Sequence, residues 1–347
     1  MNTITRYVMV LLLFMLNINT ANAENRFFFH HNPPIEFPRD EAAHDGIAEW
    51  WYWTGNVQDD EGNTYGFQLT FFNMASFFGF STLSTHVAIT DLSTGRHHHS
   101  ENFQFFHRPN KRRLNIASRI GSAERFPDGR YEISGDAEGI EYRFTLNDIK
   151  GAILHDDDGI VSIGAHAGTG YYYSRPRMDV QGTIKKGGVT ANVNGSTWMD
   201  HVWGHFVPIF IKGWDWFSIQ LDDNSEIMFW IFRRDEENPY DIELAYGTYI
   251  DSDGNASKLS QEQVDVNVLD WWQGQETNGL YPQNWTMSIP HLGFSANINA
   301  TLPEQEMPNA LWNYWEGLIS IDGTKAGNEI NGKGYVELSG YSGGWFQ

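Results

Sequence analysis

The feature that most constrains the fold is a series of short aromatic and β-branched segments, each closed by a cluster of Asp, Asn and Gly. Residues 50–58 run into DDEGN, and residues 214–221 run into DDNS. Such segments are typical of β-strands, and the clusters between them are typical of tight turns. Further segments of this kind cover residues 64–73, 86–90, 131–133, 226–232, 244–250 and 334–338. Long helical periodicity is missing, and we expect at most a short helix around residues 260–264, so the pattern predicts an all-β chain.

A faint internal repeat divides the chain into two similar halves. WYWTGNVQDD at 51–60 aligns with WDWFSIQLDD at 214–223, and MDVQGT at 178–183 resembles ISIDGT at 319–324. Duplication of one β unit explains these matches better than chance. Two units whose sheets curl or close would leave few exposed edges. We therefore expect two β-barrel domains in tandem, residues 24–195 and 196–347.

The first 23 residues have the pattern of a secretory signal. Arg6 precedes an apolar run at residues 7–16, and Ala21, Asn22 and Ala23 form a small-x-small cleavage site. The run is too short to span a bilayer, and no later segment approaches 18 apolar residues in a row, so we expect no stable membrane insertion. The pattern predicts a periplasmic or secreted protein that is cleaved after Ala23.

Composition excludes several classes of function. The chain has 44 Asp and Glu against 23 Lys and Arg, a net charge of −21, so it offers no basic surface for nucleic acid. Aromatic residues make up 15% and charged residues only 19%, which is not the composition of a disordered chain. Cysteine is absent, which excludes disulfides, cysteine nucleophiles and thiolate metal sites.

Several blocks carry a resemblance to a known family. They are EWWYWTGNVQDDEGNTYGFQLTFF (49–72), STHVAITD (84–91), STWMDHVWGHF (196–206), GWDWFSIQLDD (213–223), YWEGLISIDGT (314–324) and GKGYVELSGY (332–341). In this order they resemble the AttH/carotenoid 1,2-hydratase superfamily. The resemblance implies two tandem lipocalin-like β-barrel domains. The superfamily includes hydroxyneurosporene synthase, which adds water to an isoprenoid double bond, fungal hydratases of plant compounds, and lipocalin-like pericyclases. This chain is most similar to exported bacterial members described as secreted hydrolases or transport-associated proteins.

The resemblance places the acidic residue of the hydratase block on Asp200, with Trp198 at the neighbouring aromatic position. Hydration of a C=C bond needs a proton donor beside an apolar cavity. A carboxylic acid among aromatic rings has its charged form disfavoured, so it can stay protonated near neutral pH. Aromatic faces could then stabilise a carbocation. The alternative is a structural role, in which Asp200 caps a turn or accepts an indole N–H.

Other residues of these blocks are further candidates. Glu49 could be the partner acid or base of Asp200, or a salt-bridging residue at the barrel mouth, and His86 could be catalytic or hydrogen-bonded packing. His201 is also a catalytic candidate, but in an extended strand its side chain and that of Asp200 point to opposite faces. The candidates for the aromatic wall of a ligand cavity are Trp50, Trp51, Trp53, Trp198, Trp203 and Trp214.

We expect no metal and no cofactor. Residues 97–99 and His107 are histidines that we place in a solvated loop, because consecutive side chains diverge and no carboxylate spacing frames them. The clusters at 156–159 and 251–254 lack the ligand spacing of calcium loops and are expected to be acidic turns. No GxSxG motif, P-loop or dinucleotide fingerprint occurs.

Two hypotheses about function remain. The first is an acid–base enzyme without cofactor, a hydratase (carbon–oxygen lyase) or cyclising isomerase, acting on an isoprenoid or alkene-type substrate; a generic hydrolase is weaker, since no nucleophile is visible. The second is a non-catalytic periplasmic carrier of a small hydrophobic ligand, with an ABC-type exporter as partner. Convergence of Glu49, His86 and Asp200 on one aromatic pocket would favour the enzyme.

Overall fold

The computed structural model describes residues 33–77, 79–164, 166–234, 240–310 and 312–343. The predicted leader, residues 1–23, lies outside these ranges, so its cleavage stays a prediction. Within the described ranges, no helix has the length and apolar character needed to cross a membrane.

The first of two antiparallel sheets contains twelve strands within the described residues, in the order β4-β3-β2-β1-β12-β11-β8-β7-β6-β5, with β9 and β10 paired to β11. The strands are β1 (Gly46–Asp59), β2 (Thr64–Phe77), β3 (Phe80–Asp91), β4 (Arg96–His107), β5 (Asn115–Ala117), β6 (Gly121–Arg125), β7 (Tyr131–Ala137), β8 (Ile140–Asp148), β9 (Ile153–Leu154), β10 (Ile160–Ser162), β11 (Thr169–Lys186) and β12 (Val189–Gly204). A short 3-10 helix, η2 (Arg39–Glu41), precedes β1.

The second sheet contains ten strands within the described residues, in the order β16-β15-β14-β13-β22-β21-β19-β18-β17, with β20 paired to β21. The strands are β13 (Gly213–Leu221), β14 (Glu226–Arg233), β15 (Ile242–Ile250), β16 (Ala256–Ser260), β17 (Asp265–Gln273), β18 (Leu280–Ile289), β19 (Phe294–Ala300), β20 (Glu306–Met307), β21 (Tyr314–Lys325) and β22 (Asn328–Ser339). The short 3-10 helices η3 (Pro208–Phe210), η4 (Gln261–Gln263) and η5 (Pro290–Leu292) lie between strands, and η4 falls where a short helix was expected.

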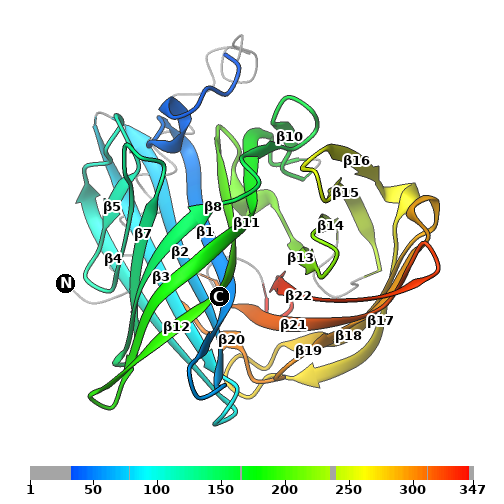
Figure 1. The fold of residues 1–347 in the computed structure, drawn as a ribbon. Helices are drawn as coiled ribbons and strands as arrows, with labels where there is room; N and C mark the ends of the chain where they lie inside the picture. Colours follow the sequence, from blue (N-terminus) through cyan, green and yellow to red (C-terminus); the bar gives the residue numbers. More distant parts are fainter. Residues whose placement is uncertain (1–32, 78, 165, 235–239, 311, 344–347) are drawn as a thin grey trace.

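Figure 1 shows the two curled sheets beside each other, each shaped as a half-barrel. The prediction of an all-β, two-part lipocalin-like chain is confirmed. The internal repeat also has a structural counterpart. In each sheet the repeated aromatic segment forms the first strand, β1 or β13, which pairs both with the next strand and with the last strand of its sheet, β12 or β22. The second repeated segment lies in β11 or β21, next to that last strand.

The change from the first sheet to the second lies after β12, which ends at Gly204. The expected boundary between residues 195 and 196 falls inside β12, which pairs with β1 and β11 on both sides of that point. The residues of the WMDH segment therefore belong to the first sheet, because their backbone groups complete its ladders. The division into separately folding domains stays a prediction.

Strand alternation distributes most of the buried apolar side chains of the described residues over three large clusters. On β1, Trp51 and Trp53 point into the core enclosed by the first sheet, whereas Tyr52 lies on the other face. Successive side chains of a strand point to opposite faces, so β1 and β14, which are buried almost throughout, contribute apolar side chains to both sides. Met228 of β14 joins the layer between the sheets, and Phe229 joins the core of the second sheet. The layer between the sheets, rather than either barrel interior, contains the candidate site.

The tight curl requires glycine where neighbouring strands approach closely. A Cβ atom on Gly195 of β12 would lie 2.0 Å from the carbonyl oxygen of Asn56, and one on Gly334 of β22 would lie 1.8 Å from that of Ser218. Backbone atoms of a paired strand cannot move away as a side chain can. These positions are therefore restricted to glycine by packing rather than by backbone torsion.

We predict that Gly195→Ala lowers the free energy of unfolding by about 1–3 kcal/mol, the usual cost of overpacking. The measurement is thermal or chemical denaturation, with Asn194→Ala, at the exposed neighbouring position, as the control. Equal stability of the two variants would show that the strands can separate at this point without cost.

Candidate functional site

A cavity of about 40 Å³ lies between the two sheets, enough for roughly three water molecules. Its wall is almost entirely aromatic and aliphatic, with few polar groups. The residues that line the cavity are Ala48, Glu49, Trp50, Tyr52, Thr70, Phe72, Met74, Tyr172, Asp200, Val202, Pro208, Ile211, Trp214, Trp216, Trp230, Trp312 and Glu337.

Asp200 presents its carboxyl group to this cavity from β12. Tyr172 donates a hydrogen bond to Asp200 Oδ2 at 2.7 Å, and Trp198 Nε1 donates to Asp200 Oδ1 at 2.6 Å. Ser174 also donates to Oδ1. Asp200 is 3% exposed and has no charged partner among the residues described. Asp200 thus lines the cavity and also accepts an indole N–H, and its catalytic role stays a prediction.

Burial determines the protonation of this carboxyl group. Burial raises the pKa of Asp200 to about 7, although the hydrogen bonds from Ser174, Tyr172 and Trp198 act in the opposite direction. Desolvation raises the pKa more than these hydrogen bonds lower it, because no positive charge compensates the carboxylate. Asp200 can therefore either donate or accept a proton near neutral pH, which is the property that general acid–base catalysis needs.

A hydrogen-bonded chain behind Asp200 reaches the second sheet. His155 Nε2 lies 2.7 Å from Ser174 Oγ, and His155 Nδ1 lies 2.8 Å from Thr248 Oγ1 on β15. Burial lowers the pKa of His155 to about 3, so its ring is neutral. A neutral imidazole donates with one nitrogen and accepts with the other, so this chain orients the Ser174 hydroxyl without adding charge.

Two glutamates of the second sheet were not identified from the sequence. Glu337 on β22 lines the cavity, and Glu316 on β21 lies directly opposite it in the ladder. Burial, together with the charge of Asp200, raises the pKa of Glu337 to about 8. Burial and the charge of Glu337 raise the pKa of Glu316 well above its ordinary value. Tyr52 of the cavity wall donates to Glu316 Oε2 at 2.6 Å. Glu316 lies in the segment YWEGL and Glu337 in the segment GYVEL. In each segment an acidic residue among apolar ones was the pattern that could have marked a buried site.

Asp200 and His201 lie on opposite faces of β12, as strand alternation predicts. The side chain of His201 is fully buried in the first sheet, where its ring stacks on Trp51 with centroids 4.6 Å apart. Its Nε2 atom lies 3.1 Å from Glu49 Oε1. Glu49 borders the cavity, but its carboxylate is bonded on the His201 face, so it does not meet Asp200.

His86 occupies a third position, behind the cavity wall. Its ring lies 5.1 Å from Phe72 and 5.5 Å from Trp312, both of which line the cavity. Its Nδ1 atom lies 2.6 Å from the Tyr314 hydroxyl, and its Nε2 atom lies 3.0 Å from Ser84 Oγ. Glu49, His86 and Asp200 therefore do not converge on one pocket, which is the arrangement that would have favoured the enzyme hypothesis.

The six expected tryptophans divide between the two faces. Trp50 and Trp214 line the cavity, and Trp198 binds Asp200 beside it. The side chains of Trp51, Trp53 and Trp203 lie in the core of the first sheet, because one strand cannot present consecutive residues to one side. The aromatic wall is completed by residues that were not predicted, namely Tyr52, Phe72, Tyr172, Trp216, Trp230 and Trp312.

The remaining clusters that the sequence singled out lie in one strand and two turns. The histidines at 97–99 and His107 lie in strand β4 rather than in the expected loop, because this segment pairs with β3 along its length. The acidic clusters at 156–159 and 251–254 do form turns, as expected. In the second turn the Asp251 carboxylate accepts backbone N–H bonds from Asp253 and Asn255.

This chain is similar in sequence and in fold to several known proteins. The model of the AttH-like family matches residues 29–341. Kievitone hydratase of Fusarium solani subsp. phaseoli is 23% identical over 215 residues, 58% of this chain and 57% of that enzyme, so the alignment covers little more than half of either protein. An AttH homologue of Nitrosomonas europaea superimposes with a TM-score of 0.79 at 29% identity, covering 90% of this chain and 99% of that one. Kievitone hydratase of Nectria haematococca shares the fold, with a TM-score of 0.74 at 16% identity over 92% and 97% of the two chains.

The raised pKa of Asp200 predicts a specific pH dependence of stability. Between its ordinary value of 3.8 and about 7, the folded protein keeps a proton that the unfolded chain has lost. The contribution of this group is therefore present at low pH and is lost as the pH rises through about 7. Asp200→Asn has no carboxyl group to ionise, so its unfolding free energy relative to that of the wild type should increase as the pH rises. The increase should be up to about 1.4 kcal/mol for each unit by which the fold raises the pKa of Asp200.

The measurement is chemical denaturation of both proteins between about pH 4 and about pH 8. Asp179→Asn, at an exposed position on β11, is the control and should show a constant difference from the wild type. A constant difference for Asp200→Asn as well would mean that Asp200 ionises in the fold as it does in water.

Proposed function

Because the chain belongs to the AttH-like family, we propose that it is an acid–base enzyme of the hydratase type, with Asp200 as its proton donor. The observation that carries the proposal is the position of Asp200, whose carboxyl group lies without a charged partner in a cavity walled by tryptophans. The name of the distantly related kievitone hydratase supports the same type of reaction. The proposed substrate is a small apolar compound that contains a carbon–carbon double bond.

The first step is protonation of the double bond. The π electrons of the alkene take the proton of Asp200, a C–H bond forms, and the other carbon becomes cationic. Tyr172, Ser174 and Trp198 already donate hydrogen bonds to the carboxylate that remains, so they stabilise it without rearrangement. The face of a desolvated aromatic ring stabilises a cation by about 1–2 kcal/mol, and Trp50 and Trp214 can supply such faces.

The second step is the addition of water, with the Asp200 carboxylate as the base. The oxygen of water bonds to the cationic carbon, and the proton that it releases goes to the carboxylate that the first step left on Asp200. The acid is thereby regenerated, and the net reaction is the addition of water to the double bond. Burial and the charge of Asp200 raise the pKa of Glu337 to about 8, so Glu337 mostly keeps its proton near neutral pH and is not the base.

The polar groups of the cavity favour an enzyme over a carrier. A carrier needs no proton donor beside its ligand, whereas Asp200 lies in the cavity wall and burial raises its pKa to about 7. Action outside the cytoplasm, after removal of residues 1–23, is part of the proposal, and an exporter partner belongs to the carrier alternative.

We predict that Asp200→Asn lowers kcat by about 100-fold or more, the usual contribution of general acid–base catalysis. The assay incubates the protein with kievitone and with a panel of short isoprenoid alkenes in water enriched in heavy oxygen. Mass spectrometry then follows incorporation of the label into an alcohol. Asp179→Asn, on the exposed side of β11, should retain full activity.

Unchanged turnover in Asp200→Asn would refute the assignment of the acid. If no probe gains heavy oxygen while native mass spectrometry of the purified protein shows a retained apolar ligand, the carrier is the better description. The two outcomes separate a wrong residue from a wrong class of function.

A further inference from the structure

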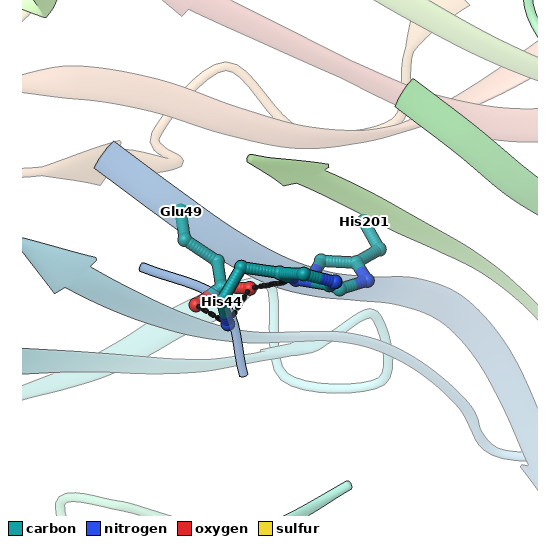
Figure 2. A group of neighbouring side chains, drawn as sticks. All are labelled: His44, Glu49 and His201. Carbon is teal, nitrogen blue, oxygen red and sulfur yellow. Dashed lines mark hydrogen bonds and ion pairs between the residues drawn. The ribbon is translucent and has the colours of Figure 1, made fainter. Parts of the chain in front are cut away.

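A second polar cluster lies on the other face of β12, away from the cavity. It consists of His44, which precedes β1, Glu49 on β1, and His201 on β12. Figure 2 shows the three side chains turned toward one another. His44 Nδ1 lies 2.8 Å and His201 Nε2 lies 3.1 Å from Glu49 Oε1. The ligating atoms of all three residues lie within 4.8 Å of one another.

These distances suit a metal ion. Zinc binds histidine nitrogen and carboxylate oxygen at about 2.0–2.2 Å, so adjacent ligand atoms of a tetrahedral site are about 3.3 Å apart. The separations of 2.8 and 3.1 Å from Glu49 Oε1 need to widen by only a few tenths of an ångström. Two imidazoles and one carboxylate are also the protein ligands of many metal sites that keep a coordination position for water.

The outer contacts of the cluster resemble those of a metal site. The second nitrogen of each imidazole already has an oxygen partner, Asp40 Oδ1 at 3.3 Å from His44 Nε2 and the Tyr173 hydroxyl at 3.3 Å from His201 Nδ1. Such partners fix which nitrogen faces the metal and how the ring is oriented. Asn73 Nδ2 donates to Glu49 Oε2 at 2.9 Å, and the backbone N–H of His44 donates to Oε1 at 3.0 Å, so the carboxylate is held with Oε1 beside the two rings.

Aromatic packing holds the rings in this arrangement. His44 stacks on Trp203 with centroids 4.2 Å apart and planes 6° from parallel, and His201 lies against Trp51. Binding would therefore cost little side-chain entropy. His201 and Glu49 are buried, whereas the side chain of His44 is 21% exposed, so an ion can enter from the side of His44.

We propose that His44, Glu49 and His201 bind one divalent transition-metal ion, such as Zn²⁺, with a coordination position left for water. The sequence did not reveal this site, because its ligands follow no motif and one of them lies outside the regular strands. The ion would connect the segment before β1 to β12, the strand that carries Asp200 on its opposite face. The proposal does not depend on the hydratase assignment.

The test uses the full chain after treatment with a chelator. Calorimetry should detect one Zn²⁺ per chain with a rise in Tm, whereas Mg²⁺, which prefers oxygen ligands, should do neither. Co²⁺ should give the visible absorption of a site with nitrogen and oxygen ligands. Absence of Zn²⁺ binding to the folded wild type would overturn the proposal.

Two variants locate the ion. His44→Ala removes the partly exposed ligand, and Glu49→Gln keeps the shape of the side chain but removes its charge. Loss of a residue that only orients a ligand typically weakens metal binding by about 10- to 100-fold. Each of these two variants should weaken Zn²⁺ binding by more than that, because each removes or alters a ligand. His98→Gln is the matched control, because His98 belongs to the histidine-rich strand β4 and should leave the affinity unchanged. Zn²⁺ binding that is lost in His98→Gln but kept in His44→Ala would place the ion on β4 and contradict the proposal.

Discussion

The structure depends on the position of one strand, β12, between β1 and β11. Its backbone completes the first sheet, and its two faces serve different environments because successive side chains alternate. Asp200 faces the layer between the sheets, and His201 faces the core of the first sheet. Two adjacent residues thus belong to two separate polar clusters. A shift of one residue in the register of β12 would exchange them and disrupt both.

The chemistry of each cluster follows from what surrounds its carboxylate. Asp200 is surrounded by neutral donors, so desolvation prevails and its pKa rises to about 7. Burial likewise acts to raise the pKa of Glu49, but the bonds from His201 and His44 outweigh it and leave that pKa below its ordinary value. A protonated acid in an apolar cavity suits proton transfer to a substrate. An ionised carboxylate between two imidazoles suits a cation.

The sequence predicted the fold well because each strand carries its own signal. The aromatic segments, their acidic turns and the repeat are local patterns, and β1 and β13 do occupy equivalent places in the two sheets. Asp200 was found because it lies inside a distinctive block. Glu337 was missed because its place beside the cavity depends on the pairing of β22 with β13, which joins residues far apart in the chain. His44 was missed because it precedes β1, where neither periodicity nor a motif marks it. The face of the sheet on which each tryptophan lies could not be predicted either, because it depends on the register of the strand pairing.

The central claim is that Asp200 titrates near neutral pH inside the cavity, so that a large share of its carboxyl groups carries a proton there. Infrared difference spectroscopy tests it directly, because a protonated carboxyl group has a C=O band that a carboxylate lacks. The wild type should show such a band that disappears with a midpoint near pH 7, and the band should be missing in Asp200→Asn. A wild type that loses the Asp200 band near the ordinary aspartate pKa of 3.8 would contradict the account, since Asp200 would then have no proton to give.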